Sequence, residues 1–306
     1  MSNQQNLAIF QFIKCPDCGK ENAIVECDAN QTISCGQCSW SRPFSKDGKV
    51  LDLLATKPKD VDGLVKNTSI SEFYYEQFQK DLSVQDLNES GWSIVNAHSS
   101  NRQSFFLRKL KAAVTQVVGL SISKKILIDL SAGAGDYTFE NAKYFDFVIH
   151  CDINGDSLIN AKNRAEQLGI HNIIFIRHDY LQFPFADKFC DIAIMIDSLE
   201  YYGHNSDKGT INNIYNMLKV NGIAIFDFHR KRPLKDNKLL YEYTRKDIDL
   251  VCESEIFNVS TLGRMVVGRI SSMSYNKYIY WILNRIFFLP AVRSLMIMKR
   301  GERRKK

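Results

Sequence analysis

The stretch from Ile126 to Thr138, "ILIDLSAGAGDYT", places an apolar run immediately before two closely spaced glycines. A short apolar run predicts a buried strand, and the glycines predict a tight turn whose backbone can approach a ligand. A dinucleotide fingerprint would have a third glycine at position 138, where this chain has Thr138. A phosphate-binding loop would end in Gly-Lys-Ser/Thr, which is also missing. The turn therefore predicts a nucleotide-like ligand of another kind.

Strands and helices alternate after this turn. Expected strands are "KILIDL", "FDFVIHCDI", "NIIFIRHD", "CDIAIMID" and "NGIAIFDFH", and expected helices lie around 136–144, 155–168 and 206–219. This alternation predicts an α/β fold with a doubly wound, mostly parallel sheet. An apolar segment at the end of the chain, "SLMIMK", is expected to add a final strand.

Acidic residues recur near the carboxyl ends of these strands. They are Asp129, Asp152, Asp179 and Asp197. Ligands bind at this edge of open α/β sheets, and a carboxylate there can accept both hydrogen bonds of a ribose diol. Four acids would repel a phosphate-rich nucleotide and attract a cationic one without phosphate. S-adenosylmethionine has a ribose, an adenine, an ammonium group and a sulfonium, so it fits.

Over residues 100–230 the sequence resembles the Rossmann-like S-adenosylmethionine-dependent methyltransferases, which implies a seven-stranded sheet. "ILIDLSAGAGDYT" resembles their Asp-x-Gly-x-Gly-x-Gly motif, with Ser131 in place of the first glycine. "HCDIN" resembles their ribose-binding segment, and "RHDYLQFPFADKFCDIAIM" their adenine-side loop. The resemblance implies that cofactor-binding residues are Asp129, Ser131, Gly133, Gly135, Asp152, Ile153, Asp179, Tyr180 and Asp197.

A general base would assist methyl transfer to a hydroxyl acceptor, and His is the commonest choice near neutral pH. His204 and His229 follow the fourth and fifth predicted strands, so they are the catalytic candidates. A structural or solvent-facing role for each of them remains the alternative.

The N-terminal part contains two CxxC pairs separated by sixteen residues, Cys15 with Cys18 and Cys35 with Cys38. This spacing is typical of a zinc site with four thiolate ligands. Four protein ligands leave no open coordination position, so the expected Zn²⁺ is structural. We expect residues 1–55 to form a small zinc ribbon that requires its metal to fold. The other cysteines, including Cys151 and Cys190, are expected in the core.

The domain prediction continues with a linker and helical segment at 56–100 and a methyltransferase domain at 101–306. This domain would include a cap or substrate insertion near 230–250 and a basic tail. The net charge of the 306 residues is +6, and the last eight residues hold six basic side chains against one acid. The nearly neutral remainder argues against an extensive nucleic-acid surface. No signal peptide is evident, and we expect a cytoplasmic protein; contact of the tail with a membrane surface is an alternative.

These observations favour a methyltransferase acting on a small-molecule, glycan or lipid-linked acceptor, at oxygen. An RNA methyltransferase is the main alternative, because the zinc ribbon and basic tail also suit RNA. A third alternative is a non-catalytic adaptor that has kept the fold. Its support is Ser131 in the cofactor motif.

Overall fold

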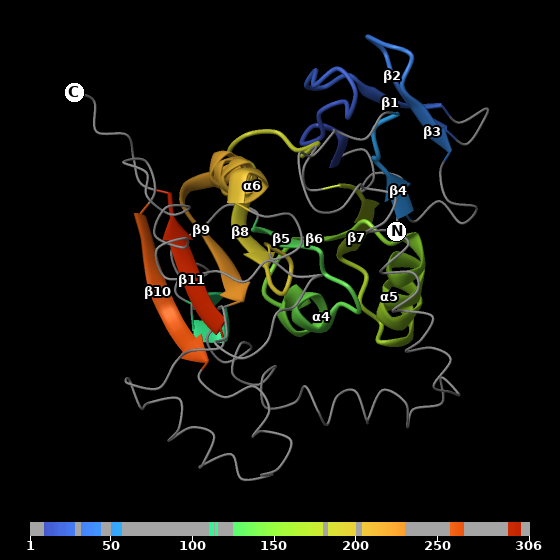
Figure 1. Ribbon diagram of the computed structural model, residues 1–306. Helices are drawn as coiled ribbons and strands as arrows, with labels where there is room; N and C mark the ends of the chain where they lie inside the picture. Colours follow the sequence, from blue (N-terminus) through green and yellow to red (C-terminus); the bar gives the residue numbers. More distant parts are fainter. Residues whose placement is uncertain are drawn as a thin grey trace, which may run out of the picture.

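The computed structural model describes residues 9–27, 32–43, 50–56, 110–112, 114–115, 125–179, 183–199, 204–229, 258–265 and 293–300. Its centre is a twisted sheet with eight strands (Figure 1). In chain order the strands are β4 (Val50–Asp52), β5 (Ile126–Leu130), β6 (Phe147–Asp152), β7 (Ile173–Arg177), β8 (Cys190–Met195), β9 (Leu218–His229), β10 (Asn258–Met265) and β11 (Arg293–Lys299).

The strand order is β10-β11-β9-β8-β5-β6-β7-β4. Strands β4 to β9 pair with one another in parallel, whereas β11 pairs antiparallel with both β9 and β10. The predicted doubly wound, mostly parallel sheet of seven strands, β5 to β11, is therefore confirmed. The predicted last strand is β11, and it lies between β9 and β10.

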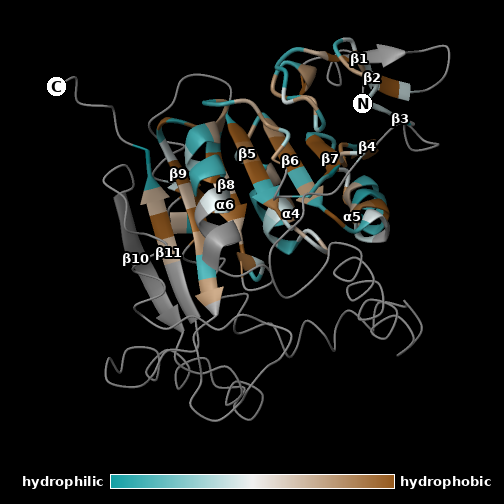
Figure 2. Cartoon of the chain, turned by 45° about the horizontal axis from the view of Figure 1, so that its top comes forward, coloured by the Kyte–Doolittle hydropathy of each residue, from teal (hydrophilic) through white to brown (hydrophobic). Residues whose placement is uncertain are grey.

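Two apolar layers cover the faces of this sheet. Successive side chains of a strand point to opposite faces, and in β5 Ile126 and Ile128 belong to one core cluster and Leu127 to the other. Helices α4 (Asp136–Ala142) and α5 (Gly155–Gln167) pack in the layer with Leu127, and α6 (His204–Met217) packs in the opposite layer. Figure 2 shows the apolar central strands between helices with polar outer faces.

The N-terminal part forms a separate three-stranded antiparallel sheet of β1 (Ile24–Cys27), β2 (Thr32–Cys35) and β3 (Ser41–Pro43). Strand β4 follows it along the chain but pairs in parallel with β7, so that Leu51 lies opposite Ile176. The predicted ribbon, residues 1–55, includes residues 50–52. In the structure they extend the main sheet, and Figure 1 shows β4 between the small sheet and β7.

Other predicted segments lie outside the described residues. These are most of the linker and helical region at 56–124, the insertion near 230–250, and the tail beyond Arg300. Among the described residues, no helix combines the length and the apolar character needed to cross a membrane.

Candidate active site

The turn between β5 and α4 has an unusual backbone. Ser131, Gly133 and Gly135 all have positive φ angles, of 55°, 52° and 83°. A Cβ atom on Gly135 would lie 2.7 Å from the ring of Phe139, so this position has no room for a side chain. A Cβ atom on Gly133 would have no heavy atom within 4 Å. Gly135 is therefore required by the fold, whereas Gly133 faces open space in which a ligand could lie.

The backbone N–H groups of this turn are already used within the protein. Gly133 N donates to Asp152 Oδ2 over 2.8 Å, Ala132 N to the Cys151 carbonyl over 2.8 Å, and Gly135 N to the Ala132 carbonyl over 2.9 Å. A phosphate-binding turn points such groups at its anion. Here three of them have acceptors inside the chain, one of which is a carboxylate, so the turn does not suit a phosphate.

Behind the turn lies a buried polar group of three side chains. Thr138 Oγ1 donates to Asp129 Oδ2 over 2.6 Å and lies 2.9 Å from His150 Nδ1. All three side chains are at most 1% exposed. Burial raises the pKa of Asp129 to about 7, and the charges of Asp152 and Asp136 act in the same direction, although the hydrogen bond from Thr138 opposes them. Burial lowers the pKa of His150 to about 3, so this imidazole is neutral near pH 7.

Asp152 ends β6 beside this turn and is paired with Arg177 of β7. Its Oδ1 accepts a hydrogen bond from Asn154 N over 2.9 Å, in addition to the bond from Gly133 to Oδ2. Burial also raises the pKa of this carboxyl, against the opposing backbone hydrogen bonds. Each carboxylate oxygen can accept more than one hydrogen bond, so Asp152 keeps capacity for a ligand hydroxyl.

The other predicted acids lie at the same edge of the sheet. Asp179 follows β7 by two residues and is 4% exposed. Asp197 follows β8 by two residues with a φ of 59°, and its backbone N–H donates to Asp227 Oδ1 over 2.8 Å. Because β5 to β8 are parallel, the edge formed by their carboxyl ends carries all four predicted acids, Asp129, Asp152, Asp179 and Asp197.

Of three further predicted residues, one is not described and two are described only in part. Tyr180 lies outside the described residues. His204 begins α6 and His229 ends β9, but the structure describes only their backbone positions. Because β8 and β9 are parallel to β5, both positions lie at the edge that carries the acids.

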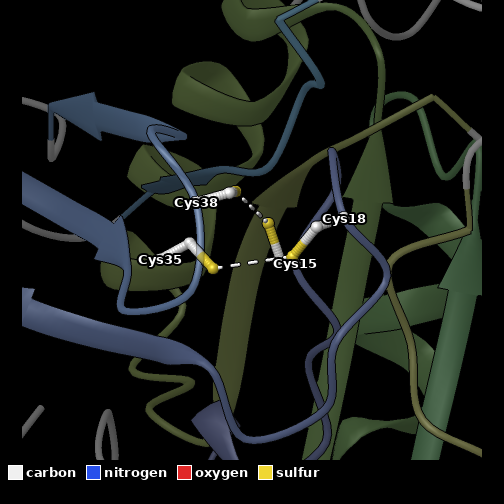
Figure 3. A group of neighbouring side chains, drawn as sticks. All are labelled: Cys15, Cys18, Cys35 and Cys38. Atoms are coloured by element: carbon white, nitrogen blue, oxygen red, sulfur yellow. Dashed lines mark hydrogen bonds between the residues drawn. The ribbon is translucent and has the colours of Figure 1, made fainter.

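The four predicted metal-ligating cysteines lie together (Figure 3), with all of their sulfur atoms within 4.8 Å of one another. Cys15 Sγ is 3.6 Å from Cys38 Sγ, and Cys18 Sγ is 3.7 Å from Cys35 Sγ. Zn–S bonds of about 2.3 Å in a tetrahedron give sulfur–sulfur distances of roughly 3.8 Å. The cluster therefore has the ligand type and the size that a zinc ion requires. Cys151 and Cys190 are buried in the core, as predicted.

Several residues at this site are not among the residues predicted from the sequence. Thr138 enters the prediction only as the replacement of a glycine, and His150 does not enter it. Thr138 lies in the first turn of α4, directly after the glycine turn, and His150 lies opposite Asp129 in the β5–β6 pairing, so both could have been considered once these elements were predicted. Arg177 and Asp52, which support the Asp152 turn from the sheet edge, carried no recognisable pattern.

The parallel sheet and its flanking helices form a Rossmann-like fold. Residues 127–222 match a family model described as a methyltransferase domain. A protein of Geobacillus sp. (strain WCH70), named as a candidate methyltransferase, is 30% identical over 128 residues, which are 42% of this chain and 49% of that protein. The chain thus covers about half the length of this relative.

Solved structures agree on the fold. The magnesium protoporphyrin IX methyltransferase of Synechocystis PCC 6803 with bound S-adenosylhomocysteine has a TM-score of 0.52 at 14% identity, covering 77% of this chain and 100% of that one. A phosphoethanolamine N-methyltransferase of Haemonchus contortus has a TM-score of 0.50 at 13% identity, covering 79% of this chain and 52% of that one. At these identities the likeness concerns the fold alone.

Proposed function

We propose that this protein is an S-adenosylmethionine-dependent methyltransferase that acts on a small-molecule, glycan or lipid-linked acceptor, at oxygen. One observation carries the choice of cofactor. The turn that holds phosphate in other nucleotide-binding folds donates its Gly133 N–H to the carboxylate of Asp152. A carboxylate in this place disfavours a phosphate and favours a cationic nucleoside with a free ribose.

The described residues fit the parts of this cofactor. Asp129, buried beside the turn, would face the ammonium group, and Asp152 would accept hydrogen bonds from the ribose hydroxyls. Asp179 would lie at the adenine, and Tyr180, which lies outside the described residues, is the second proposed adenine contact. The open space at Gly133 leaves room for the methionine part. When bound, the cofactor supplies an activated methyl group, and the protein's task is to position an acceptor in line with it.

A hydroxyl acceptor must also lose a proton. His204 and His229 are the proposed general bases, because α6 begins and β9 ends at the edge that carries the acids. A bell-shaped or sigmoidal pH–rate profile that loses its acidic limb in only one of the His204→Ala and His229→Ala variants would assign the base. A profile unchanged in both variants would contradict this role for either residue.

We further propose that Cys15, Cys18, Cys35 and Cys38 hold a structural zinc ion. The thiolate ligands and their spacing support Zn²⁺ over harder metals. Metal analysis of protein purified without added zinc should give one zinc per chain. A value near zero after purification with and without zinc would contradict this assignment.

The cofactor proposal is tested by isothermal titration of S-adenosylmethionine into the zinc-loaded chain, with NAD and ATP as comparison ligands. We expect binding of S-adenosylmethionine alone, and its loss in Asp152→Ala. Asp146→Asn is the matched control, because Asp146 also accepts a backbone hydrogen bond, from Lys125 N over 2.7 Å, at the opposite edge of the sheet. No binding to the intact chain would leave the adaptor alternative in its place.

The acceptor is then sought with S-adenosylmethionine that carries a labelled methyl group. Metabolite, lipid and RNA fractions of a cell extract are incubated with the protein separately. Label in the metabolite or lipid fraction is the expected result. Label in RNA that disappears after ribonuclease treatment would favour the alternative acceptor.

A further inference from the structure

The contacts between the N-terminal ribbon and the main sheet converge on the candidate cofactor site. "The ribbon" here means the described residues 9–43. They share one continuous hydrophobic cluster with the main domain, in which Ile13 and Trp40 are at most 1% exposed. Because the cluster also contains Phe185 and Phe189, from the segment after β7, the ribbon is packed against that segment rather than joined to the domain only by a linker.

One group of contacts holds the segment after β7, of which the structure describes residues 178–179 and 183–189. Lys14 N donates to the Pro184 carbonyl over 3.0 Å, and Ala186 N donates to the Phe12 carbonyl over 2.8 Å. Between them, Ile13 and Phe185 form an antiparallel bridge. The residue after Lys14 is Cys15, so the first metal-ligating cysteine adjoins this clamp directly.

We call the contacts of residues 12–14 with residues 184–186 the clamp. His178 connects the clamp with the candidate adenine site. Its ring packs edge-on against Phe185, with ring centroids 5.1 Å apart, and it is 3% exposed. The backbone N–H of His178 also donates to the Asp152 carbonyl over 3.1 Å. Asp179, the proposed adenine contact, is the next residue. Through these contacts the ribbon holds in place the segment that carries Asp179.

A second group of contacts runs from the other cysteine pair to the ribose side. Cys35 N donates to the Trp40 carbonyl over 2.9 Å, and the Trp40 indole donates to the Leu54 carbonyl over 3.0 Å. Leu54 N in turn donates to Asp52 Oδ1 over 3.0 Å. These bonds tie the end of β4 to the second half of the cysteine cluster.

From Asp52 the contacts continue across the sheet. Asp52 Oδ2 forms an ion pair with Arg177 Nη1 over 3.4 Å, and Arg177 Nε donates to the Ile153 carbonyl over 2.9 Å. Ile153 directly follows Asp152, the proposed ribose acid. Arg177 is therefore a positioning residue: it supports the turn after β6 and is itself held by Asp52 of β4, the strand whose end is tied to the ribbon.

We infer that the ribbon positions both halves of the cofactor site, so that metal occupancy of the four cysteines and cofactor affinity are coupled. The inference rests on the proposed function. Removing the metal frees both cysteine pairs, and the clamp at Pro184 and the Asp52–Arg177 support then lose their anchors. Coupling of this kind is reciprocal, so the cofactor must raise the affinity for zinc by the same factor as zinc raises the affinity for the cofactor.

The test compares the full-length chain in zinc-loaded and chelator-stripped form, with S-adenosylhomocysteine as the probe. We expect its Kd to rise at least fivefold on stripping, within the usual range of such couplings. In competition with a chromogenic zinc chelator, saturating S-adenosylhomocysteine should raise zinc affinity by the same factor. Equal Kd values in the two forms would overturn the coupling and leave the proposed function intact. No binding in either form would overturn both.

A second variant keeps the test sound if the stripped chain does not stay folded. Asp52→Asn retains an acceptor for Leu54 N but removes the charge that holds Arg177. In the zinc-loaded variant we expect one zinc per chain, a Kd raised severalfold, and faster hydrogen exchange at the His178 amide. Asp146→Asn is the matched control and should change none of these. Unchanged Kd and exchange in Asp52→Asn would overturn the positioning role of Arg177.

Discussion

Thr138 Oγ1 donates a hydrogen bond to Asp129 Oδ2 over 2.6 Å in the buried region behind the β5–α4 turn. A threonine hydroxyl has a single proton, so when Asp129 is ionised the contact of 2.9 Å with His150 Nδ1 has the imidazole as the donor. In this state His150 is the neutral tautomer with its proton on Nδ1. The two bonds form a chain from His150 through Thr138 to Asp129, and they orient the carboxylate that is proposed to face the cofactor.

Thr138→Val tests this chain, because valine keeps the shape and removes the hydroxyl. The Asp129 carboxylate and the His150 N–H would both lose their partner, and leaving a buried polar group unsatisfied costs about 1–3 kcal/mol. We expect a lower melting temperature by thermal denaturation. We also expect a cofactor Kd at pH 7 that is raised several-fold, because the bond that opposes protonation of Asp129 is lost.

The control for this variant is Thr115→Val. Thr115 is exposed, and its hydroxyl donates to the Lys111 carbonyl within the same helical turn over 2.8 Å. The change there should stay within about 0.5 kcal/mol, as is usual for surface substitutions. Equal destabilisation by the two substitutions would argue against a special role for Thr138.

The raised pKa of Asp129 predicts how cofactor binding depends on pH. A cationic group binds best to the ionised carboxylate, and the folded-state pKa of Asp129 is about 7 in the free protein. Affinity should therefore rise from pH 6 to pH 8 and level off above this range. Asp129→Asn should bind weakly at every pH without this rise, and a wild-type affinity that is flat across pH 6–8 would contradict the assignment. Isothermal titration at several pH values measures the cofactor affinity of the wild type and of Asp129→Asn.

The raised pKa of Asp129 also affects the stability of the fold. Its contribution to stability falls as the pH rises, whereas the cofactor affinity is expected to increase. An unfolded Asp has a pKa of about 3.9, so between that value and about 7 the folded state binds more protons at Asp129 than the unfolded state does. The contribution of Asp129 to stability is therefore greatest at low pH and declines as the pH rises through this window. Buried His150 and His178 act in the opposite direction, because their pKa values are lowered. The difference in free energy of unfolding between wild type and Asp129→Asn isolates the Asp129 part.

The two glycines of the turn should respond differently to alanine. Gly135→Ala places a methyl group 2.7 Å from the Phe139 ring at a φ of 83°, so we expect severe destabilisation. Gly133→Ala has the strain of a positive φ, about 1 kcal/mol, but meets no protein atom. We expect Gly133→Ala to fold and to lose cofactor affinity, because its methyl group occupies ligand space. Thermal denaturation and titration separate the two effects, and equal loss of stability in both variants would contradict this reading.

Much of this site could be predicted from sequence, because local patterns determine it. The apolar run before Gly133 predicts β5, and each acid at a strand end predicts its own place at the edge of a parallel sheet. Cys15 and Cys38 have a spacing that specifies their chemistry before any fold is known. In each case a few residues that lie close together in the sequence determine the local structure or chemistry.

The residues that could not be predicted act across long separations. Arg177 supports the Ile153 carbonyl and is held by Asp52, which lies 125 residues earlier in the chain. Such a pair leaves no periodic or spacing signal, and β4 has only three residues, too few to show a pattern. The inferred role of the ribbon in the cofactor site follows from three-dimensional contacts, namely the pairing of β4 with β7 and the bridge between Ile13 and Phe185.

The cysteine cluster gives a final prediction, in which one ligand is removed. Cys18→Ser replaces an exposed thiolate ligand with a hydroxyl, which is a poor ligand for zinc, so zinc content should fall well below one per chain. The ribbon would then lose the free energy of metal binding that we expect it to need for folding, and its residues should become sensitive to protease. Cys190→Ser is the matched control, because Cys190 is buried outside the cluster and its thiol donates to the Met217 carbonyl over 3.4 Å, a bond that serine can keep. The control should retain its zinc. Full zinc content in Cys18→Ser, measured by elemental analysis, would show that Cys18 is not a ligand.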